Sequence, residues 1–131
     1  TVKVRTELQE TMMENVSVFR NEDTLSHALT DIEGLRARAK QVVVEDKSKR
    51  FNTDLMDAVE AGFMVDYAEA IAACARHRTE SRGAHSREDY EDRDDDSWLR
   101  HTLFRSDCNG TYKFDEKDVV ITRFEPKERK Y

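Results

Sequence analysis

The residues most suited to chemistry in this sequence lie in one short polar segment, SRGAHSREDY, which follows an alanine-rich stretch. The segment brings Arg82, His85, Arg87 and Asp89 close together in the chain, around Gly83. Arginine can form two parallel hydrogen bonds to a carboxylate, and histidine changes its charge near neutral pH. The segment therefore predicts either an interface that binds carboxylates and carbonyls of another domain or a polar surface loop, and its chemistry alone favours neither.

The acidic run EDYEDRDDD overlaps this segment and partly fits a calcium-binding loop. A loop that starts at Asp92 would place acids at Asp94 and Asp96, as the EF-hand pattern requires. The pattern also requires glycine where Ser97 stands and a bidentate glutamate where Leu103 stands. Both requirements fail, so the run is interpreted as a solvated loop whose charges pair with neighbouring arginines.

Other candidate sites are weaker. Cys74 and His77 could share a metal with His85, but a structural zinc site has four ligands, and a small buried cysteine is the better interpretation. The basic cluster Lys47–Arg50 could contact a phosphate, but a solvated connector is the better interpretation. Unaided catalysis through His85 or His101 finds no support, because the sequence contains no catalytic triad context and no glycine-rich phosphate loop.

Length and composition narrow the class of protein. The chain has 131 residues, of which 37% are hydrophobic and 38% charged, with a net charge of −6 and a mean hydropathy of −0.86. One polar domain fits this length, and the negative charge argues weakly against nucleic-acid binding. No apolar window is long enough for a transmembrane helix, and no signal peptide is visible. The two cysteines indicate a reducing compartment, and the missing initiator methionine suggests a fragment or processed chain.

Three helices are predicted from apolar residues that recur every three or four positions. The first covers about residues 4–15, the second follows the N-cap Asn21, and the third covers about 54–79 and ends near Gly83. We expect the third helix to be the central and most buried one. Its predicted buried stripe consists of Leu55, Val59, Phe63, Tyr67, Ile71 and Ala75, and it is expected to share a core with Leu29 and Ile32.

The pattern changes at Trp98. Residues 98–104 and 111–114 are typical of two strands joined by a turn at 107–110, and 119–124 is a further extended piece before a basic tail. The predicted fold class is mainly α: an up-down three-helix bundle, similar in arrangement to a spectrin repeat, followed by a small β-hairpin. Residues 1–97 would form the bundle with its polar loop and residues 98–131 the appendage, within one domain.

A resemblance to a known family distinguishes between the open alternatives. ESRGAHSREDY followed by RDDDSWLRHTL closely resembles the carboxy-terminal domain of succinate dehydrogenase and fumarate reductase flavoprotein subunits. The match continues through NVSVFR, RFNTDL and RFEP, so it spans essentially the whole chain. The domain of L-aspartate oxidase is related, but WLRHTL is more similar to succinate dehydrogenase. Glu91 departs from the pattern, because the family commonly has proline there.

The resemblance implies a structural and docking role and no catalytic site in this chain. In the family, FAD is bound by an amino-terminal dinucleotide fold, and substrate lies between that fold and a capping domain. The implied partners are these two domains and the iron–sulfur subunit, with no metal, no nucleic acid and no direct membrane insertion. The implied location is the cytoplasmic face of a membrane-associated complex. A freestanding interaction module is the alternative.

The resemblance also directs attention to the polar segment as an interface with other domains. The residues expected there are Arg82, Gly83, His85, Arg87, Asp89, Arg93, Asp94 and His101. If Arg87 serves another domain and not the fold of this one, Arg87→Ala should change the stability of the isolated chain by less than about 0.5 kcal/mol.

Overall fold

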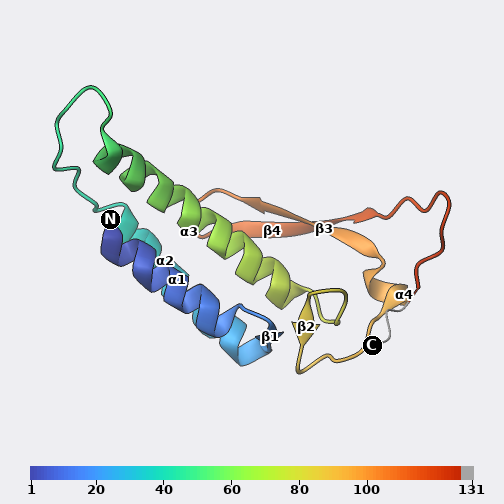
Figure 1. The fold of residues 1–131 in the computed structure, drawn as a ribbon. Helices are drawn as coiled ribbons and strands as arrows, with labels where there is room; N and C mark the ends of the chain where they lie inside the picture. The colour runs from blue at the N-terminus through green and yellow to red at the C-terminus, as the bar shows by residue number, and fades with distance from the viewer. Residues whose placement is uncertain (128–131) are drawn as a thin grey trace.

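The computed structural model describes residues 1–127 and has three helices in an up-down-up bundle with a β-hairpin laid along one side (Figure 1). Helix α1 covers Val2–Asn15, α2 covers Glu22–Ala39 and α3 covers Thr53–His77. The fold class predicted from the sequence is confirmed. The end of the predicted basic tail, from residue 128 onward, lies outside the described residues.

The first two helices begin and pack as their sequences predict. Asn21 caps α2 by accepting a hydrogen bond from the Thr24 backbone N–H, and the Thr24 hydroxyl in turn accepts one from the Asn21 N–H. The apolar stripes of both helices are buried. Their fully buried apolar side chains are Val4, Leu8, Leu25, Ala28, Ile32 and Leu35.

Helix α3 buries a different face from the one predicted. The side chains that share the core with α1 and α2 are mostly small, namely Val65, Ala68, Ala72 and Ala75. Of the predicted stripe only Ala75 is buried, whereas Leu55, Val59, Phe63, Tyr67 and Ile71 are 48–72% exposed. Small residues allow the axes of two helices to approach closely, so the bundle forms on the alanine-rich side of α3 and leaves the large side chains outside.

A buried ion pair ties α3 to its neighbours. Arg36 of α2 donates to Glu69 at 2.8 Å and to Asp66 at 3.0 Å, and Glu69 also accepts a hydrogen bond from Ser106 in the hairpin at 3.2 Å. Arg36 and Glu69 are both more than nine-tenths buried, so each charge depends on the other for compensation. Glu69 therefore holds α2 and the hairpin to the same point of α3.

The hairpin is confirmed, although its first strand begins at Arg100, two residues after the predicted start at Trp98. Strand β3 covers Arg100–Ser106 and pairs antiparallel with β4, Tyr112–Asp118, with Phe104 opposite Phe114. Residues 119–124, all of which the structure describes, form no strand, so the further extended piece expected there is not part of a sheet. His77, at the end of α3, stacks on Phe114 with ring centroids 4.0 Å apart, which packs the hairpin against the bundle.

Between α3 and the hairpin, the polar segment folds into a loop with little regular structure. The loop contains the short strand β2, Ser86–Arg87, and the single-turn helix α4, Asp95–Trp98. β2 pairs in parallel with β1, Phe19–Arg20, which links the loop to the connection between α1 and α2. Helix α3 ends at His77, before the predicted end near Gly83. Gly83 instead lies in a separate tight turn, with a φ of +61°. Two backbone hydrogen bonds between Arg82 and His85, of 2.8 and 3.0 Å, close this turn.

Candidate functional site

The polar loop is organised around a carboxylate that the sequence analysis did not single out, Glu80. Its side chain is fully buried and accepts hydrogen bonds from Arg82 at 2.8 and 3.0 Å, from the Asp94 backbone N–H at 2.9 Å, and from Arg78. Burial alone would raise the pKa of Glu80, but the hydrogen bonds from Arg82, Asp94 and Arg78 outweigh it and lower the pKa. Glu80 thus stays ionised and joins both ends of the loop.

Arg87 joins the ends of two helices. Its guanidinium, 1% exposed as a residue, donates to the carbonyls of Ala75 and Arg76 at 3.0 and 2.9 Å, where α3 ends. It also forms a bidentate ion pair with the Asp89 carboxylate, in which both hydrogen bonds are 2.7 Å long. The Asp89 carboxylate in turn accepts a hydrogen bond of 2.9 Å from the backbone N–H of Glu22, in the first turn of α2. The Arg87 hydrogen bonds lower the pKa of Asp89 to about 2.

These buried contacts favour a role for Arg87 in the fold of this chain, in place of the small contribution expected from the sequence. A cation at a helix C-terminus and an anion at a helix N-terminus are both favourable, and Arg87 with Asp89 supplies one of each. We name this pair, together with the carbonyls and the N–H that it binds, the Arg87 brace. Sequence spacing did not reveal the brace, because the two helix ends meet only in the folded bundle.

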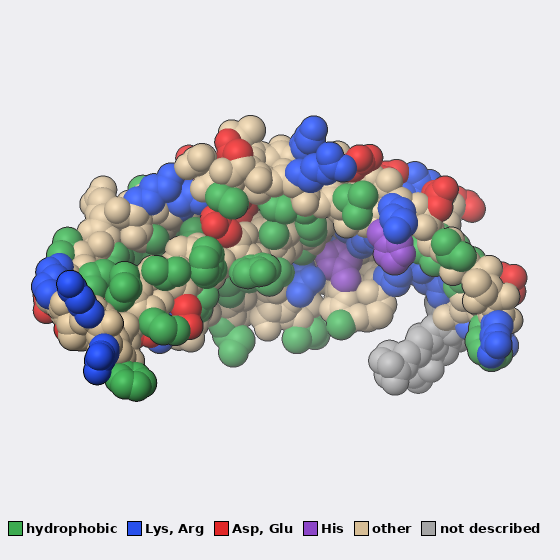
Figure 2. All heavy atoms as spheres, turned by 90° about the horizontal axis from the view of Figure 1, so that it is seen from above, with side chains coloured by type: hydrophobic (Ala, Val, Ile, Leu, Met, Phe, Trp, Pro, Cys, Tyr) green, Lys and Arg blue, Asp and Glu red, His purple; other side chains and the backbone are tan. Residues whose placement is uncertain are grey.

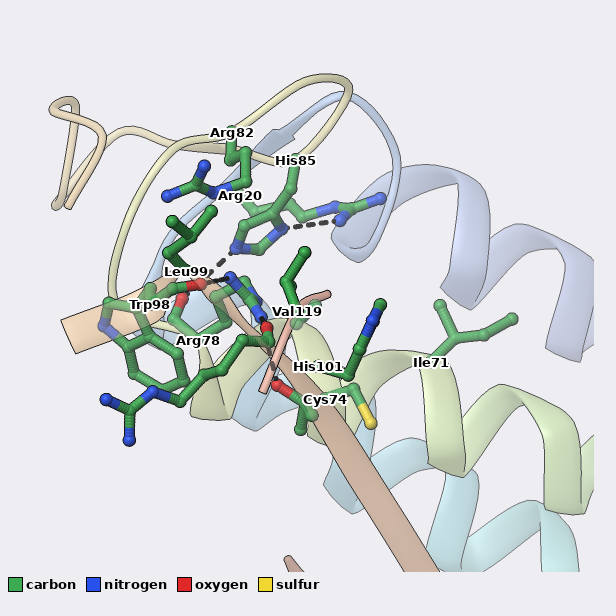
Figure 3. A pocket seen from close by; sticks show the side chains of 13 residues that line it. Arg20, Ile71, Cys74, Arg78, Arg82, His85, Trp98, Leu99, His101 and Val119 are labelled. Atoms are coloured by element: carbon green, nitrogen blue, oxygen red, sulfur yellow. Dashed lines mark hydrogen bonds between the residues drawn. The ribbon is translucent and has the colours of Figure 1, made fainter. Parts of the chain in front are cut away.

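His85 lies between two arginines (Figure 3). Its Nδ1 accepts a hydrogen bond from Arg20 at 3.0 Å, so the ring proton is on Nε2, which donates to the Arg78 carbonyl at 3.2 Å. Burial lowers the pKa of His85, and the positive charges of Arg20, Arg87 and Arg78 lower it further. The hydrogen bond to the Arg78 carbonyl raises this pKa, but the net shift is downward. Arg20 also donates to the carbonyls of Val16 and Ser17, so His85 connects the end of α1 to the loop.

The remaining residues predicted for the interface are spread over the loop and β3. Arg93 pairs with Asp95 at 2.7 Å, and Asp94 caps α4 through the Ser97 backbone N–H at 2.9 Å, which lowers the Asp94 pKa. His101 is exposed on β3. The structure therefore places Arg82, His85, Arg87 and Asp89 in one loop, where their side chains form hydrogen bonds within this chain. It leaves His101 on the surface.

A cleft of about 580 Å³ opens beside this loop, between the end of α3, β3 and the segment after β4 (Figure 3). Its described lining combines apolar side chains with four arginines and two histidines and includes no acidic residue. Arg78 lies over the Trp98 ring, 5.1 Å from its centroid, and forms one wall of the cleft. The basic residues of the cleft are Arg20, Arg78, Arg82, Arg100, His85 and His101.

The described residues do not offer a metal site. Residues 1–127 hold no group of three or more histidine, cysteine or acidic side chains placed to bind an ion. His77 stacks on Phe114, and His85 accepts a hydrogen bond from Arg20. No helix among the described residues is both long and apolar enough to cross a membrane.

The N-termini of α2 and α3 do not fit the pyrophosphate of a flavin dinucleotide. Such cofactors place a pyrophosphate on free backbone N–H groups at a helix N-terminus that follows a glycine-rich turn. Here Asn21 and Asn52 cap α2 and α3 with their own side chains, and Asp89 occupies a further N–H of α2. No step of flavin chemistry is therefore assigned to this chain.

The chain is thus a helical bundle with a side hairpin, and a loop held by arginine–carboxylate bonds connects the two. Residues 5–131 match the family model described as the fumarate reductase flavoprotein C-terminal region. The chain belongs to this family.

Individual relatives agree with the family model. The chain is 39% identical over 129 residues to the fumarate reductase flavoprotein subunit of Haemophilus influenzae, covering 98% of this chain and 22% of that protein. It is 39% identical over 120 residues to the succinate dehydrogenase flavoprotein subunit of Rickettsia conorii, covering 92% and 20%. The chain thus spans about a fifth of these curated relatives. The resemblance stated from the sequence is confirmed, and the L-aspartate oxidase and freestanding-module alternatives are not favoured.

Solved structures show the same fold. The quinol fumarate reductase of E. coli aligns with a TM-score of 0.91 at 36% identity, over 97% of this chain and 22% of that one. The Sdh1 complex of Mycobacterium smegmatis aligns with a TM-score of 0.83 at 28% identity, over 93% and 21%.

Proposed function

We propose that this chain is the carboxy-terminal structural and docking domain of a flavoprotein subunit that oxidises succinate to fumarate. The complete subunit would use FAD bound by its other domains and pass electrons to an iron–sulfur subunit. The observation that supports this proposal best is the family match over residues 5–131, on a fold whose motif residues are engaged in bracing the domain. The chemistry of the cofactor would be supplied elsewhere in the subunit.

The proposal extends to partners and place. The flavin-binding and capping domains of the same subunit would contact this domain, and the iron–sulfur subunit would complete the assembly. The complex would be attached to the cytoplasmic face of a membrane by other subunits. Of the residues expected at the interface, His101 and Gly83 are exposed and remain proposed contacts, whereas Arg87 is assigned to the fold.

Flavin content and turnover test the proposal. The purified chain of 131 residues should be colourless and should reduce no dye with succinate. The complete subunit that contains it should show flavin absorbance and should reduce the dye. Deleting this domain from the complete subunit should abolish retained flavin or assembly with the iron–sulfur subunit. Turnover by the chain alone, or unchanged assembly and turnover after the deletion, would contradict the proposal.

A further inference from the structure

The cleft beside the polar loop carries positive charge that its own lining does not neutralise. Its described charged lining consists of arginines and histidines, and Figure 2 shows histidine side chains together with lysine and arginine side chains at one place on this face. Carboxylates outside the lining neutralise part of this charge. Glu80 pairs with both Arg78 and Arg82, and Glu116 pairs with Arg100. Three of the four arginines of the cleft therefore have a carboxylate partner.

Arg20 is the fourth arginine, and its partners are all uncharged. Its guanidinium donates to the carbonyls of Val16 and Ser17 at 3.0 and 2.7 Å and to Nδ1 of the neutral His85 ring at 3.0 Å. Among residues 1–127, no acidic side chain forms an ion pair with Arg20. Burial lowers the pKa of Arg20, because this charge is held partly away from water. A partly buried charge with neutral neighbours attracts a counter-ion.

The rest of the lining limits which kind of anion fits. Ile71, Leu99 and Val119 give the same cleft apolar walls (Figure 3). A bare inorganic anion would leave these walls in water, whereas a hydrocarbon chain attached to the anion would cover them. The volume of about 580 Å³ lies in the range of sites that hold small organic molecules. One guanidinium without a carboxylate matches one carboxylate on the ligand.

We propose that the cleft binds a small organic acid, whose single carboxylate pairs with Arg20 and whose hydrocarbon part lies against Ile71 and Val119. The carboxylate supplies the negative charge that the cleft lining lacks. The hydrocarbon part replaces water on the apolar walls, so both halves of the ligand contribute to binding. This assignment goes beyond the proposed function, because it gives the domain a ligand of its own that takes no part in the oxidation of succinate.

Arginine labelling of the complete flavoprotein subunit tests the proposal. Phenylglyoxal modifies accessible guanidinium groups, and peptide mass spectrometry follows each arginine separately. Hexanoate is the probe, and inorganic phosphate and 1-hexanol test the charge and the hydrocarbon chain alone. At ten times its Kd, hexanoate leaves about one site in eleven empty, so labelling of Arg20 should slow about tenfold. Arg105 is the control and should keep its rate, since its side chain is 64% exposed on β3 and does not line the cleft.

Two substitutions test the same site by charge. His101→Glu adds a carboxylate to the cleft lining, and Lys113→Glu is its control, because Lys113 is exposed on β4 outside the cleft. Repulsion should raise the hexanoate concentration that protects Arg20 at least about threefold in His101→Glu, with no change in Lys113→Glu.

Several results would overturn the proposal. They are an unchanged Arg20 rate with hexanoate, equal protection by phosphate or 1-hexanol, and equal effects of the two substitutions. An Arg20 that does not react before any acid is added would show that the protein itself covers the site, which also overturns the proposal. Succinate-dependent dye reduction is measured separately, so an inactive subunit with a hexanoate-protected Arg20 would contradict the proposed function and leave the ligand site standing.

Discussion

Removing Arg87 should destabilise this chain far more than removing an arginine from its surface. Arg87→Ala deletes two bonds to the carbonyls at the end of α3 and both bonds to Asp89. Breaking a buried ion pair from one side costs about 3–5 kcal/mol. The Asp89 side chain is 29% exposed and can recover some hydration, so we expect a loss of about 2–4 kcal/mol.

Urea unfolding of the 131-residue chain, followed by circular dichroism, measures this loss. Arg38→Ala is the control. Arg38 also forms two hydrogen bonds to a carboxylate, that of Glu7, but both side chains are more than two-fifths exposed. Water screens this pair, so its removal should cost much less stability than the removal of Arg87. If Arg87→Ala costs no more than Arg38→Ala, the Arg87 brace does not hold the helix ends together and the reasoning is wrong.

Acid should reveal the same brace. The pKa of Asp89 is lowered to about 2, so its contribution to stability is complete above its ordinary pKa of 3.8 and is lost as the pH falls towards 2. Arg87→Ala removes the cause of that shift. The substituted chain should therefore lose less stability than the parent between about pH 4 and pH 2, and an unchanged acid dependence would count against the assignment.

The other predictions concern the loop, the two faces of the bundle and His85. Glu80→Gln should cost about 2–4 kcal/mol, because it leaves the charges of Arg78 and Arg82 without their buried partner; a neutral effect in a urea melt would show that the loop does not depend on this carboxylate. Phe63→Ala should cost under about 1 kcal/mol in the isolated chain, since Phe63 is 59% exposed, while Leu25→Ala should cost about 2–5 kcal/mol; similar losses at both positions would mean that α3 buries its outer face after all. The pKa of His85 is lowered in the folded chain, so on acidification the unfolded chain binds a proton at this residue before the folded chain does. The free energy of unfolding should therefore fall as the pH drops below about 6.5. An NMR titration that gives His85 its ordinary pKa or a higher one would refute this.

Local sequence patterns predicted the parts of this fold that local physics controls. The stripe of α2 and the N-cap Asn21 lie where helix periodicity and capping place them, and the hairpin turn follows from residues 107–110. The family followed from ESRGAHSREDY and RDDDSWLRHTL, supported by the shorter matches NVSVFR, RFNTDL and RFEP. Each of these signals depends on residues that are neighbours in the chain.

The face of α3 that forms the core was decided only by the tertiary structure. This helix is apolar on more than one side, with Ala68 and Ala72 on one face and Phe63 and Tyr67 on another. A period of 3.6 residues fits both faces, and large side chains are the usual choice for a core. Close approach of α1 and α2 selected the small residues instead, and that contact is not encoded in the spacing along α3.

The role of the polar loop was decided in the same way. Its arginines are suited to carboxylates in any setting, and the sequence did not say whether those carboxylates belong to this chain or to another. Folding brings the end of α3 and the start of α2 to the same place, and Arg87 and Asp89 satisfy both helix ends there. The sequence alone determined which chemistry the loop has, and the arrangement of the helices determined what that chemistry binds, because helix ends distant in the chain become neighbours only in the folded bundle.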